Sequence, residues 1–224
     1  MARFVEERAL VARAWRGLYE FFYAGLKGGT ALLFRPLFRT RVIGRRPHLP
    51  RGGVLLCPNH QSYLDPAFIQ LVTPRRVTFV MTNAFYASRY ARWFFRLVGA
   101  LPLGSGRLAL TTTRRAAALL RLGGALVVFP EGKLSTDGML SPAQRGIAIL
   151  ARRGRVPVVP MAIEGSRNAW PRGAKWLRCA DVRVAFGDAL RCESVGGRVA
   201  DQRFADEVLA SIADLKRRLP PPRP

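Results

Sequence analysis

The sequence predicts an α/β fold, a single domain with a largely parallel, mixed sheet flanked by helices, preceded by an N-terminal helical segment. Short apolar runs typical of buried strands alternate with stretches of helical character along most of the chain. No internal repeat of roughly 20 to 50 residues is present. A length of 224 residues is ordinary for one domain. We expect three parts, namely the N-terminal segment (1–44), the α/β domain (45–219) and a disordered tail (220–224).

The N-terminal segment combines aromatic and apolar residues with scattered positive charge. Residues 18–38 are rich in Leu, Phe and Tyr, but Lys27 and the pair Gly28–Gly29 interrupt them, so no run reaches the ~20 apolar residues of a spanning helix. The charged residues before them do not fit a signal peptide. We expect two short helices, residues 6–26 and 30–38, that anchor the chain at a membrane surface. Alternatively, their apolar faces pack against the domain.

A polar turn follows the first central strand of the predicted domain. The apolar run at residues 54–57 indicates a buried strand, and a helix begins at Pro66, so His60 and Asp65 lie on a strand-to-helix loop. The short spacing allows the Asp65 carboxylate to reach one ring nitrogen of His60, which leaves the other nitrogen free to take a proton from a hydroxyl. Alternatively, Asp65 only caps the helix and His60 has no chemical task.

The later elements alternate in the same way. Strands are expected at residues 77–81, 125–128, 156–163 and 181–186, and helices at residues 86–97, 111–122, 142–153 and 200–219. This order favours a largely parallel sheet.

A second polar turn follows the strand at residues 125–128. It comprises residues 129–135, with the sequence Phe-Pro-Glu-Gly-Lys-Leu-Ser. Turns at the carboxyl ends of two strands can face one crevice, so this turn and His60 can share a site. A lone Pro-Glu-Gly is otherwise an ordinary tight turn with a solvated glutamate.

These two turns resemble the motifs of a known family. His60 and Asp65 match a His-x4-Asp motif, and residues 129–135 are similar to a Phe-Pro-Glu-Gly-Thr-Arg-Ser block. Residues 99–103 and 156–160 resemble two further blocks of that family in the expected order. The family is the PlsC-like glycerolipid acyltransferases, of the 1-acyl-glycerol-3-phosphate acyltransferase type. The resemblance spans residues 45–188.

The resemblance implies an O-acyltransferase of phospholipid biosynthesis. Its expected acceptor is the free hydroxyl of a lysophospholipid, in the first place 1-acyl-glycerol-3-phosphate, which would give phosphatidic acid. The implied catalytic residues are His60 and Asp65. The implied substrate-binding residues are Glu131, Gly132, Lys133 and Ser135.

The chain departs from the family pattern where the acceptor phosphate is held. The threonine and arginine of the family's third block are Lys133 and Leu134 here. The family's acidic or amide residue and its phosphate-holding arginine are replaced by Gly104 and Ser105, and Arg107 comes two residues late as a candidate substitute. Lysine offers a point charge without the two-pronged geometry of arginine. Another lysolipid headgroup is therefore an alternative acceptor.

The expected mechanism follows from the type of nucleophile. A hydrolase built on a His-Asp pair needs a protein nucleophile, yet no Gly-x-Ser-x-Gly elbow is present. The hydroxyl then comes from the lysolipid, which His60 deprotonates as it attacks the thioester of an acyl-CoA or acyl-carrier protein. Because a thioester is already activated, we expect no further cofactor and no metal.

The net charge points to an anionic partner. Lys and Arg number 37 against 14 Asp and Glu, which gives a formal charge of +23. A nucleic-acid-binding protein would gather arginine and aromatic residues on one surface, whereas here the arginines are scattered, so we expect membrane lipids and no nucleic acid as partners. The expected location is the cytoplasmic face of a membrane, as a peripheral or monotopic protein. An arginine-biased proteome, a nucleic-acid-binding protein and a non-catalytic lipid-binding relative remain alternatives.

Two weaker signals point to other kinds of site. The three cysteines form no Cys-x-x-Cys pair, and Cys57 with His60 lacks a second ligand pair, which argues against zinc. Residues 104–109 satisfy a loose Gly-x-Gly-x-x-Ala dinucleotide pattern, but a cofactor there explains neither His60 nor the Pro-Glu-Gly turn.

Overall fold

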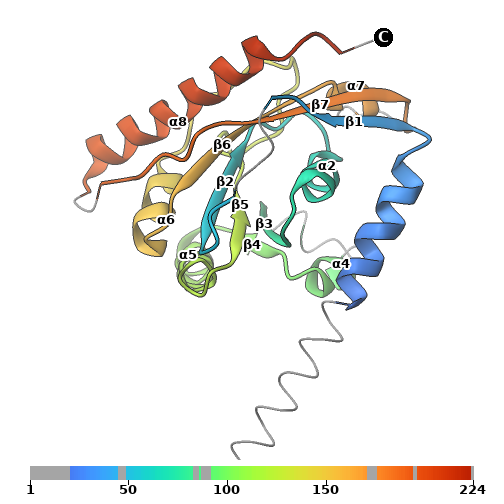
Figure 1. Cartoon of the computed structure of the whole chain (residues 1–224). Helices are drawn as coiled ribbons and strands as arrows, with labels where there is room; N and C mark the ends of the chain where they lie inside the picture. Colours follow the sequence, from blue (N-terminus) through green and yellow to red (C-terminus); the bar gives the residue numbers. More distant parts are fainter. Residues whose placement is uncertain are drawn as a thin grey trace, which may run out of the picture. The chain divides into compact units, whose positions relative to one another are not determined.

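Apolar runs in the sequence become the strands of one mixed sheet. The computed structural model describes residues 21–44, 49–82, 86, 92–170, 176–193 and 196–222. Its strands are β1 (Phe38–Val42), β2 (Val54–Pro58), β3 (Val77–Thr82), β4 (Leu101–Leu103), β5 (Ala125–Val127), β6 (Val158–Glu164) and β7 (Ala180–Phe186). Within the described residues they form a single sheet in the order β1-β7-β6-β2-β5-β3-β4 (Figure 1).

Most neighbouring strands of the sheet are parallel. β2 pairs in parallel with β5 and with β6, and β3 pairs in parallel with β5 and with β4. Only β6 and β7 run antiparallel, and β1 runs parallel to β7. The prediction of a largely parallel sheet with a mixed edge is therefore confirmed. The carboxyl ends of β2, β5 and β6 lie next to one another at one edge, where polar turns can meet.

Helices cover both faces of the sheet. They are α2 (Asp65–Val72), α4 (Arg92–Leu97), α5 (Gly106–Arg121), α6 (Gly146–Gly154), α7 (Ser166–Ala169) and α8 (Arg198–Arg218). In Figure 1, α5, α6 and α8 lie on one side of the sheet and α2 lies on the other. Phe68 of α2 packs edge-to-face on Phe38 of β1, with ring centroids 5.3 Å apart.

The main core lies between the central strands and the layer of α5, α6 and α8. All five residues of β2 are buried. Leu55 of β2, Leu120 of α5, Ile147 of α6 and Val208 of α8 belong to one hydrophobic cluster. A strand covered on both faces reads as a continuous apolar run, which is why β2 was recognisable from its sequence.

The N-terminal segment differs from its expected form. The chain divides into two compact units, Met1–Pro36 and Leu37–Pro224. Within the first unit, residues 21–34 form one unbroken helix, so Gly28 and Gly29 do not end it. Residues 1–20, which include most of the first predicted helix, lie outside the described residues. Residues 38–42, expected in the helical segment, form β1 instead, because their backbone completes the sheet beside β7.

Several helices also begin at other residues than predicted. The helix expected from residue 111 begins at Gly106, and the helix expected from residue 142 begins at Gly146. Residues 141–145 stay outside α6 because Ser141 and Gln144 donate their N–H groups to the turn at residues 130 and 131. A short helix that was not predicted, α7, follows β6. Residues 87–91 of the predicted helix at 86–97 are not described.

Candidate active site

The two polar turns meet at the carboxyl ends of β2 and β5. The backbone N–H of His60 donates to Glu131 Oε1 at 3.1 Å, and the backbone N–H of Ser135 donates to the carbonyl of His60 at 2.9 Å. The parallel pairing of β2 with β5 brings them together. The prediction that both turns share one site is thereby met in the structure.

His60 is held by a buried carboxylate. Its Nδ1 lies 2.8 Å from Asp65 Oδ2, which also accepts the backbone N–H groups of Gln61 at 2.7 Å and Ser62 at 2.8 Å. The Asp65 side chain is fully buried, whereas that of His60 is 17% exposed. An ionised Asp65 accepts a hydrogen bond from the Nδ1–H group of His60. Nε2 of the neutral ring is then left as a hydrogen-bond acceptor.

The alternative role of Asp65 as a helix cap is not what the structure shows. Asp65 is the first residue of α2, the N-cap is Leu64, and no side chain caps the helix. The carboxylate is turned back toward the His60 turn. The imidazole also stacks on Phe129, with ring centroids 3.8 Å apart. The ring is therefore fixed on one side by charge and on one face by an aromatic side chain.

The buried side chain of Glu131 holds the His60 turn in place. It is only 3% exposed. Its Oε1 accepts the N–H of His60, and its Oε2 accepts the N–H of Ser141 at 2.8 Å. Burial raises the pKa of Glu131, while these two N–H groups, the charge of a protonated His60 and the charge of Lys216 lower it. Both oxygens thus accept backbone N–H groups, which holds the His60 turn in place, and a direct contact of Glu131 with an acceptor stays a prediction.

The other residues of the second turn fall into two groups. Gly132 has a φ of +67°, a conformation that glycine adopts without strain. Ser135 is buried, and its hydroxyl donates to the carbonyl of Met139 and accepts the N–H of Gly138, so it shapes the loop. Lys133 is exposed and carries the turn's free positive charge. Within this turn, Lys133 thus offers an exposed charged group to a ligand.

Arg107 lies apart from this site. It sits exposed in the first turn of α5, directly after β4. β4 is three strands from β2, or about 14 Å at the usual strand spacing. Within the described residues no hydrogen bond or ion pair joins Arg107 to either polar turn, and a role of Arg107 in acceptor binding stays a prediction. The dinucleotide-like glycines at residues 104–106 share this position at the outer strand of the sheet.

The acyltransferase family pattern matches residues 39–164 of the chain. The match contains both polar turns and covers more than half of the sequence. This chain belongs to the acyltransferase family. The resemblance stated from the motifs alone is therefore confirmed.

Relatives within the acyltransferase family carry a common name. The chain is 28% identical over 199 residues to the chloroplastic 1-acyl-sn-glycerol-3-phosphate acyltransferase BAT2 of Brassica napus, a match that covers 84% of this chain and 57% of the relative. It is 22% identical over 155 residues to the 1-acyl-sn-glycerol-3-phosphate acyltransferase of Bacillus subtilis, covering 69% of this chain and 74% of that one. The chain spans about half the length of the plant acyltransferases it matches.

A solved acyltransferase has the same fold. The crystal structure of PlsC, the 1-acyl-sn-glycerophosphate (LPA) acyltransferase of Thermotoga maritima, superposes with a TM-score of 0.74 at 20% identity. The superposition covers 92% of this chain and 84% of that one. The α/β architecture is thus shared over nearly the whole chain.

The structure adds supporting residues that the sequence did not reveal. Lys216 of α8 forms an ion pair with Glu164 at 2.9 Å and donates to the carbonyl of Gly138 at 2.9 Å. Gln61 donates to the same carbonyl at 3.3 Å. Lys216 lies 78 residues from Gly138, so no local sequence signal could have found it. Of these supporting residues, Gln61 alone lies within a motif found in the sequence, where it follows His60.

Asn59 fastens the His60 turn to β6. Its side chain donates to the carbonyl of Ile163 at 3.0 Å and accepts the N–H of the same residue at 2.7 Å. Asn59 is 1% exposed. Both polar atoms of the amide are satisfied, as a buried amide requires, and the turn is fixed on the side away from β5.

Cys57 lies in the core of the sheet. Cys57 is buried in β2, and burial raises the pKa of its thiol. Among the described residues, no group of three or more His, Cys, Asp or Glu side chains is placed to hold a metal ion. Cys57 is a core residue of the strand that carries the His60 turn.

Proposed function

We propose that this chain transfers a fatty acyl group from a thioester to the free hydroxyl of 1-acyl-glycerol-3-phosphate, which yields phosphatidic acid. The observation that carries the proposal is the bond between His60 Nδ1 and Asp65 Oδ2 at 2.8 Å, in a member of the acyltransferase family. The names of the relatives support the choice of acceptor. The activity, substrates and partners of the whole protein are part of this proposal.

The proposed reaction needs only the protein's own base. Nε2 of His60 takes the proton of the lysolipid hydroxyl as the oxygen attacks the thioester carbonyl. The tetrahedral intermediate then expels the thiolate, the C–S bond breaks, and the imidazolium returns the proton to the sulfur. Asp65 stabilises the imidazolium in between. The donor is an acyl-CoA or an acyl-carrier protein, and the proposal includes no other cofactor and no metal.

Lys133 is the proposed contact to the acceptor headgroup. It is exposed on the turn that bonds to His60, and its ammonium group attracts a phosphate as a point charge. The family's arginine is absent at the next position, where this chain has Leu134. Another lysolipid headgroup remains the alternative acceptor, because a single ammonium group discriminates poorly between phosphate monoesters and diesters.

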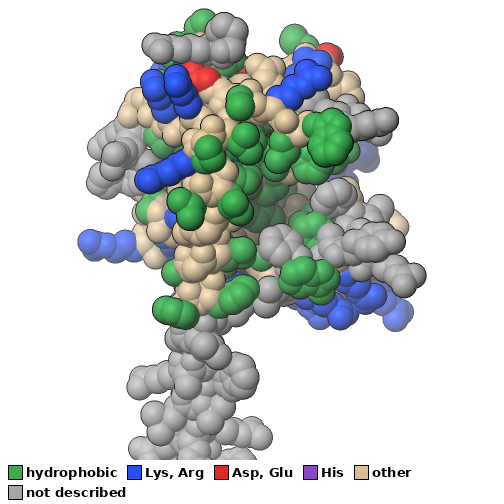
Figure 2. All heavy atoms as spheres, turned by 90° about the vertical axis from the view of Figure 1, so that its right-hand side faces the viewer, with side chains coloured by type: hydrophobic (Ala, Val, Ile, Leu, Met, Phe, Trp, Pro, Cys, Tyr) green, Lys and Arg blue, Asp and Glu red, His purple; other side chains and the backbone are tan. Residues whose placement is uncertain are grey.

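The proposed location is the cytoplasmic face of a membrane, as a peripheral or monotopic protein. The helix at residues 21–34 exposes the large side chains of Phe21, Leu32 and Leu33. The second unit also exposes Trp93, Leu103 and Leu110. Hydrophobic side chains interspersed with Lys and Arg are visible on the face drawn in Figure 2. No helix within the described residues is both long and apolar enough to cross a bilayer.

The test is an acyl-transfer assay of the purified protein. Palmitoyl-CoA or oleoyl-CoA is offered with lysophosphatidic acid and, separately, with lysophospholipids of other headgroups. We expect transfer to lysophosphatidic acid, loss of transfer in His60→Ala with an unchanged Tm, and a raised acceptor KM in Lys133→Ala. Near-wild-type turnover of His60→Ala would remove the proposed base, and a clear preference for a diester acceptor would replace the proposed substrate.

A further inference from the structure

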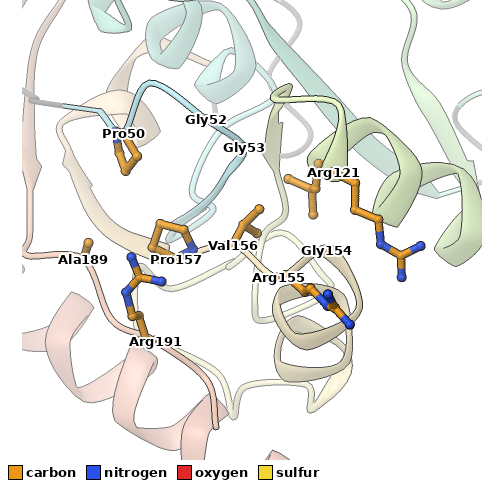
Figure 3. Close-up of a pocket in the computed structure, with 11 residues that line it drawn as sticks. Pro50, Gly52, Gly53, Arg121, Gly154, Arg155, Val156, Pro157, Ala189 and Arg191 are labelled. Atoms are coloured by element: carbon orange, nitrogen blue, oxygen red, sulfur yellow. The ribbon is translucent and has the colours of Figure 1, made fainter. Parts of the chain in front are cut away.

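A cavity of about 800 Å³ lies far from the His60 turn. Its walls include residues 50–53 before β2, the end of α5, the turn between α6 and β6, and the segment after β7 (Figure 3). Gly53 and Pro157 directly precede β2 and β6, so the cavity opens at the amino ends of these strands. His60 follows the carboxyl end of β2, about 16 Å away for a strand of five residues. The cavity is therefore separate from the acyl-transfer site.

The rim of the cavity is held in place by a network of hydrogen bonds. The guanidinium group of Arg75 donates to the carbonyl of Pro50 at 2.5 Å, to that of Gly52 at 2.7 Å and to that of Gly123. Gly53 admits no side chain, because a Cβ there would lie 2.0 Å from the carbonyl oxygen of Leu120. The wall before β2 is thus preformed, and binding a ligand would cost little ordering of this segment.

The lining combines an apolar floor with positive charge. Leu120 and Val156 lie almost buried at its base, 1% and 8% exposed, and Pro50 and Ala189 supply the more accessible apolar surface. Three arginines line the cavity, Arg121, Arg155 and Arg191, and none of the lining residues is acidic. In the described part of the chain, no ion pair ties these arginines to a carboxylate.

The arginines come from different elements. Arg121 ends α5, Arg155 follows α6, and Arg191 follows β7. Arg121 Nε donates to the carbonyl of Arg153 at 2.8 Å, which orients the guanidinium group and leaves its two terminal nitrogens available. In Figure 3, Arg191 lies beside Ala189 and Pro157, apart from Arg121 and Arg155. Charges placed on separate walls favour an extended anion over a single small ion.

Arg155 occupies a strained backbone position. Its φ of 55° and ψ of 44° place it in the left-handed region, and it is the only non-glycine residue with a positive φ among the described residues. Glycine or asparagine usually fills this position after a helix. An arginine there costs stability that glycine would recover. From this position the exposed side chain of Arg155 lines the cavity.

We propose that this cavity binds a nucleoside polyphosphate. The phosphates would lie between the guanidinium groups of Arg121, Arg155 and Arg191, which match phosphate oxygens in pairs. The sugar and base would cover the apolar floor, and the cavity has the volume of an ordinary small-molecule site. The proposal does not depend on the lysolipid substrate of the active site.

The first test is calorimetric titration of the whole chain with ATP as the probe. We expect saturable binding that Arg155→Gly and Arg191→Ala each weaken about tenfold to a hundredfold, the range for losing a hydrogen-bonded charge pair. Two controls keep the wild-type affinity. Arg203→Ala removes an exposed arginine of α8 outside the cavity, and Lys133→Ala removes the positive charge beside His60.

Arg155→Gly also has a second, opposite expectation. Because glycine relieves the left-handed strain, the variant should raise Tm by about 2 °C while it weakens ATP binding. A loss of binding through misfolding would lower Tm instead.

Three outcomes would overturn the proposal. They are the absence of saturable ATP binding, equal affinity in the wild type and Arg155→Gly, and an Arg203→Ala variant that weakens binding as much as Arg191→Ala does. The last result would mean that ATP binds only the general positive surface.

Titration with inorganic triphosphate and with adenosine shows which part of ATP makes the contacts. Weaker binding of each than of ATP supports the nucleotide, and binding of triphosphate equal to ATP overturns the role of the apolar floor.

Discussion

At the scale of single residues, Asp65 decides the geometry of the site. One oxygen, Oδ2, accepts the ring N–H of His60 and two backbone N–H groups. The carboxylate is fully buried, and its other oxygen has no hydrogen-bond partner among the described residues. A negative charge in this position therefore stabilises the His60 turn and, in the proposed reaction, the imidazolium that forms during proton transfer.

Asp65→Asn should reduce kcat by about 10²- to 10⁴-fold, the usual range for general-base assistance. The amide oxygen can replace Oδ2 as an acceptor, but it carries no charge to stabilise the imidazolium. The measurement is steady-state acyl transfer with Tm recorded alongside. A kcat within about twofold of the wild type would show that His60 works without a charged partner.

Lys216→Met should move the acidic limb of the pH–activity profile to higher pH. Burial raises the pKa of Glu131, and the charge of Lys216 acts against this rise. Without that charge Glu131 takes up a proton at higher pH, and its neutral form is a poorer acceptor for the N–H groups of His60 and Ser141. The measurement is kcat/KM as a function of pH.

The matched control is Arg217→Met. Arg217 is the next residue of α8, its side chain is 75% exposed, and its partner is Asp214. This substitution removes one positive charge from the same turn of α8 and leaves the contacts of Lys216 with Gly138 and Glu164 in place. Lys216→Arg should restore the wild-type profile. An acidic limb that stays in place in Lys216→Met would limit Lys216 to a structural role.

At the scale of elements, the layer of α6 and α8 is joined by one ion pair. The guanidinium group of Arg152 on α6 donates to both oxygens of Asp201 on α8, and the Asp201 side chain is only 7% exposed. Arg152 lowers the pKa of Asp201 below its ordinary value. Both helices contribute to the main hydrophobic cluster, Ile147 from α6 and Val208 from α8, so the pair links two elements that cover the core.

Asp201→Asn should lower the free energy of unfolding by about 1 to 3 kcal/mol at neutral pH. Because the folded-state pKa of Asp201 is lowered, its contribution is present above the ordinary aspartate pKa of about 3.9 and is lost as pH falls further. The difference between wild type and variant should therefore shrink below about pH 4. Urea unfolding at pH 7 and pH 3 measures both quantities.

Asp206→Asn is the comparison variant for this pair. Asp206 is an exposed residue of α8 that accepts from Gln202 of the same helix. Its loss should change stability little at either pH. A gap between wild type and Asp201→Asn that stays constant from pH 7 to pH 3 would mean that ionisation of Asp201 does not stabilise the fold.

At the scale of the whole molecule, positive charge and exposed apolar side chains occur together. The formal charge is +23, and Leu32 and Leu33 in the N-terminal unit are 72% and 71% exposed. Anionic lipid attracts such a chain, and apolar side chains gain free energy by entering the acyl boundary. Nucleic acid would be attracted by charge alone.

Replacing Leu32 and Leu33 together by serine should weaken binding to anionic vesicles about tenfold to a hundredfold, as expected for part of the burial energy of two leucines. Vesicle flotation at moderate salt measures this. Leu122→Ser and Val199→Ser change exposed apolar residues of the second unit and should have little effect. Retention on DNA that exceeds vesicle binding in all variants would favour the nucleic-acid alternative.

The sequence by itself determined five of the seven described strands and the turn that holds His60 and Asp65. Buried strands such as β2 are continuous apolar runs, and the spacing of His60 and Asp65 lets both lie in one turn. These features depend on neighbours within a few residues, so pattern and spacing suffice. The motifs also gave the family.

Only the tertiary structure decided what supports and surrounds that turn. Lys216 contacts a carbonyl 78 residues away, and Glu131 bonds to a backbone group 71 residues away. The same holds for β1, which became a strand by pairing with β7, and for the three arginines that converge on one cavity. Such contacts arise from how strands and helices pack, and no local pattern of residues records them.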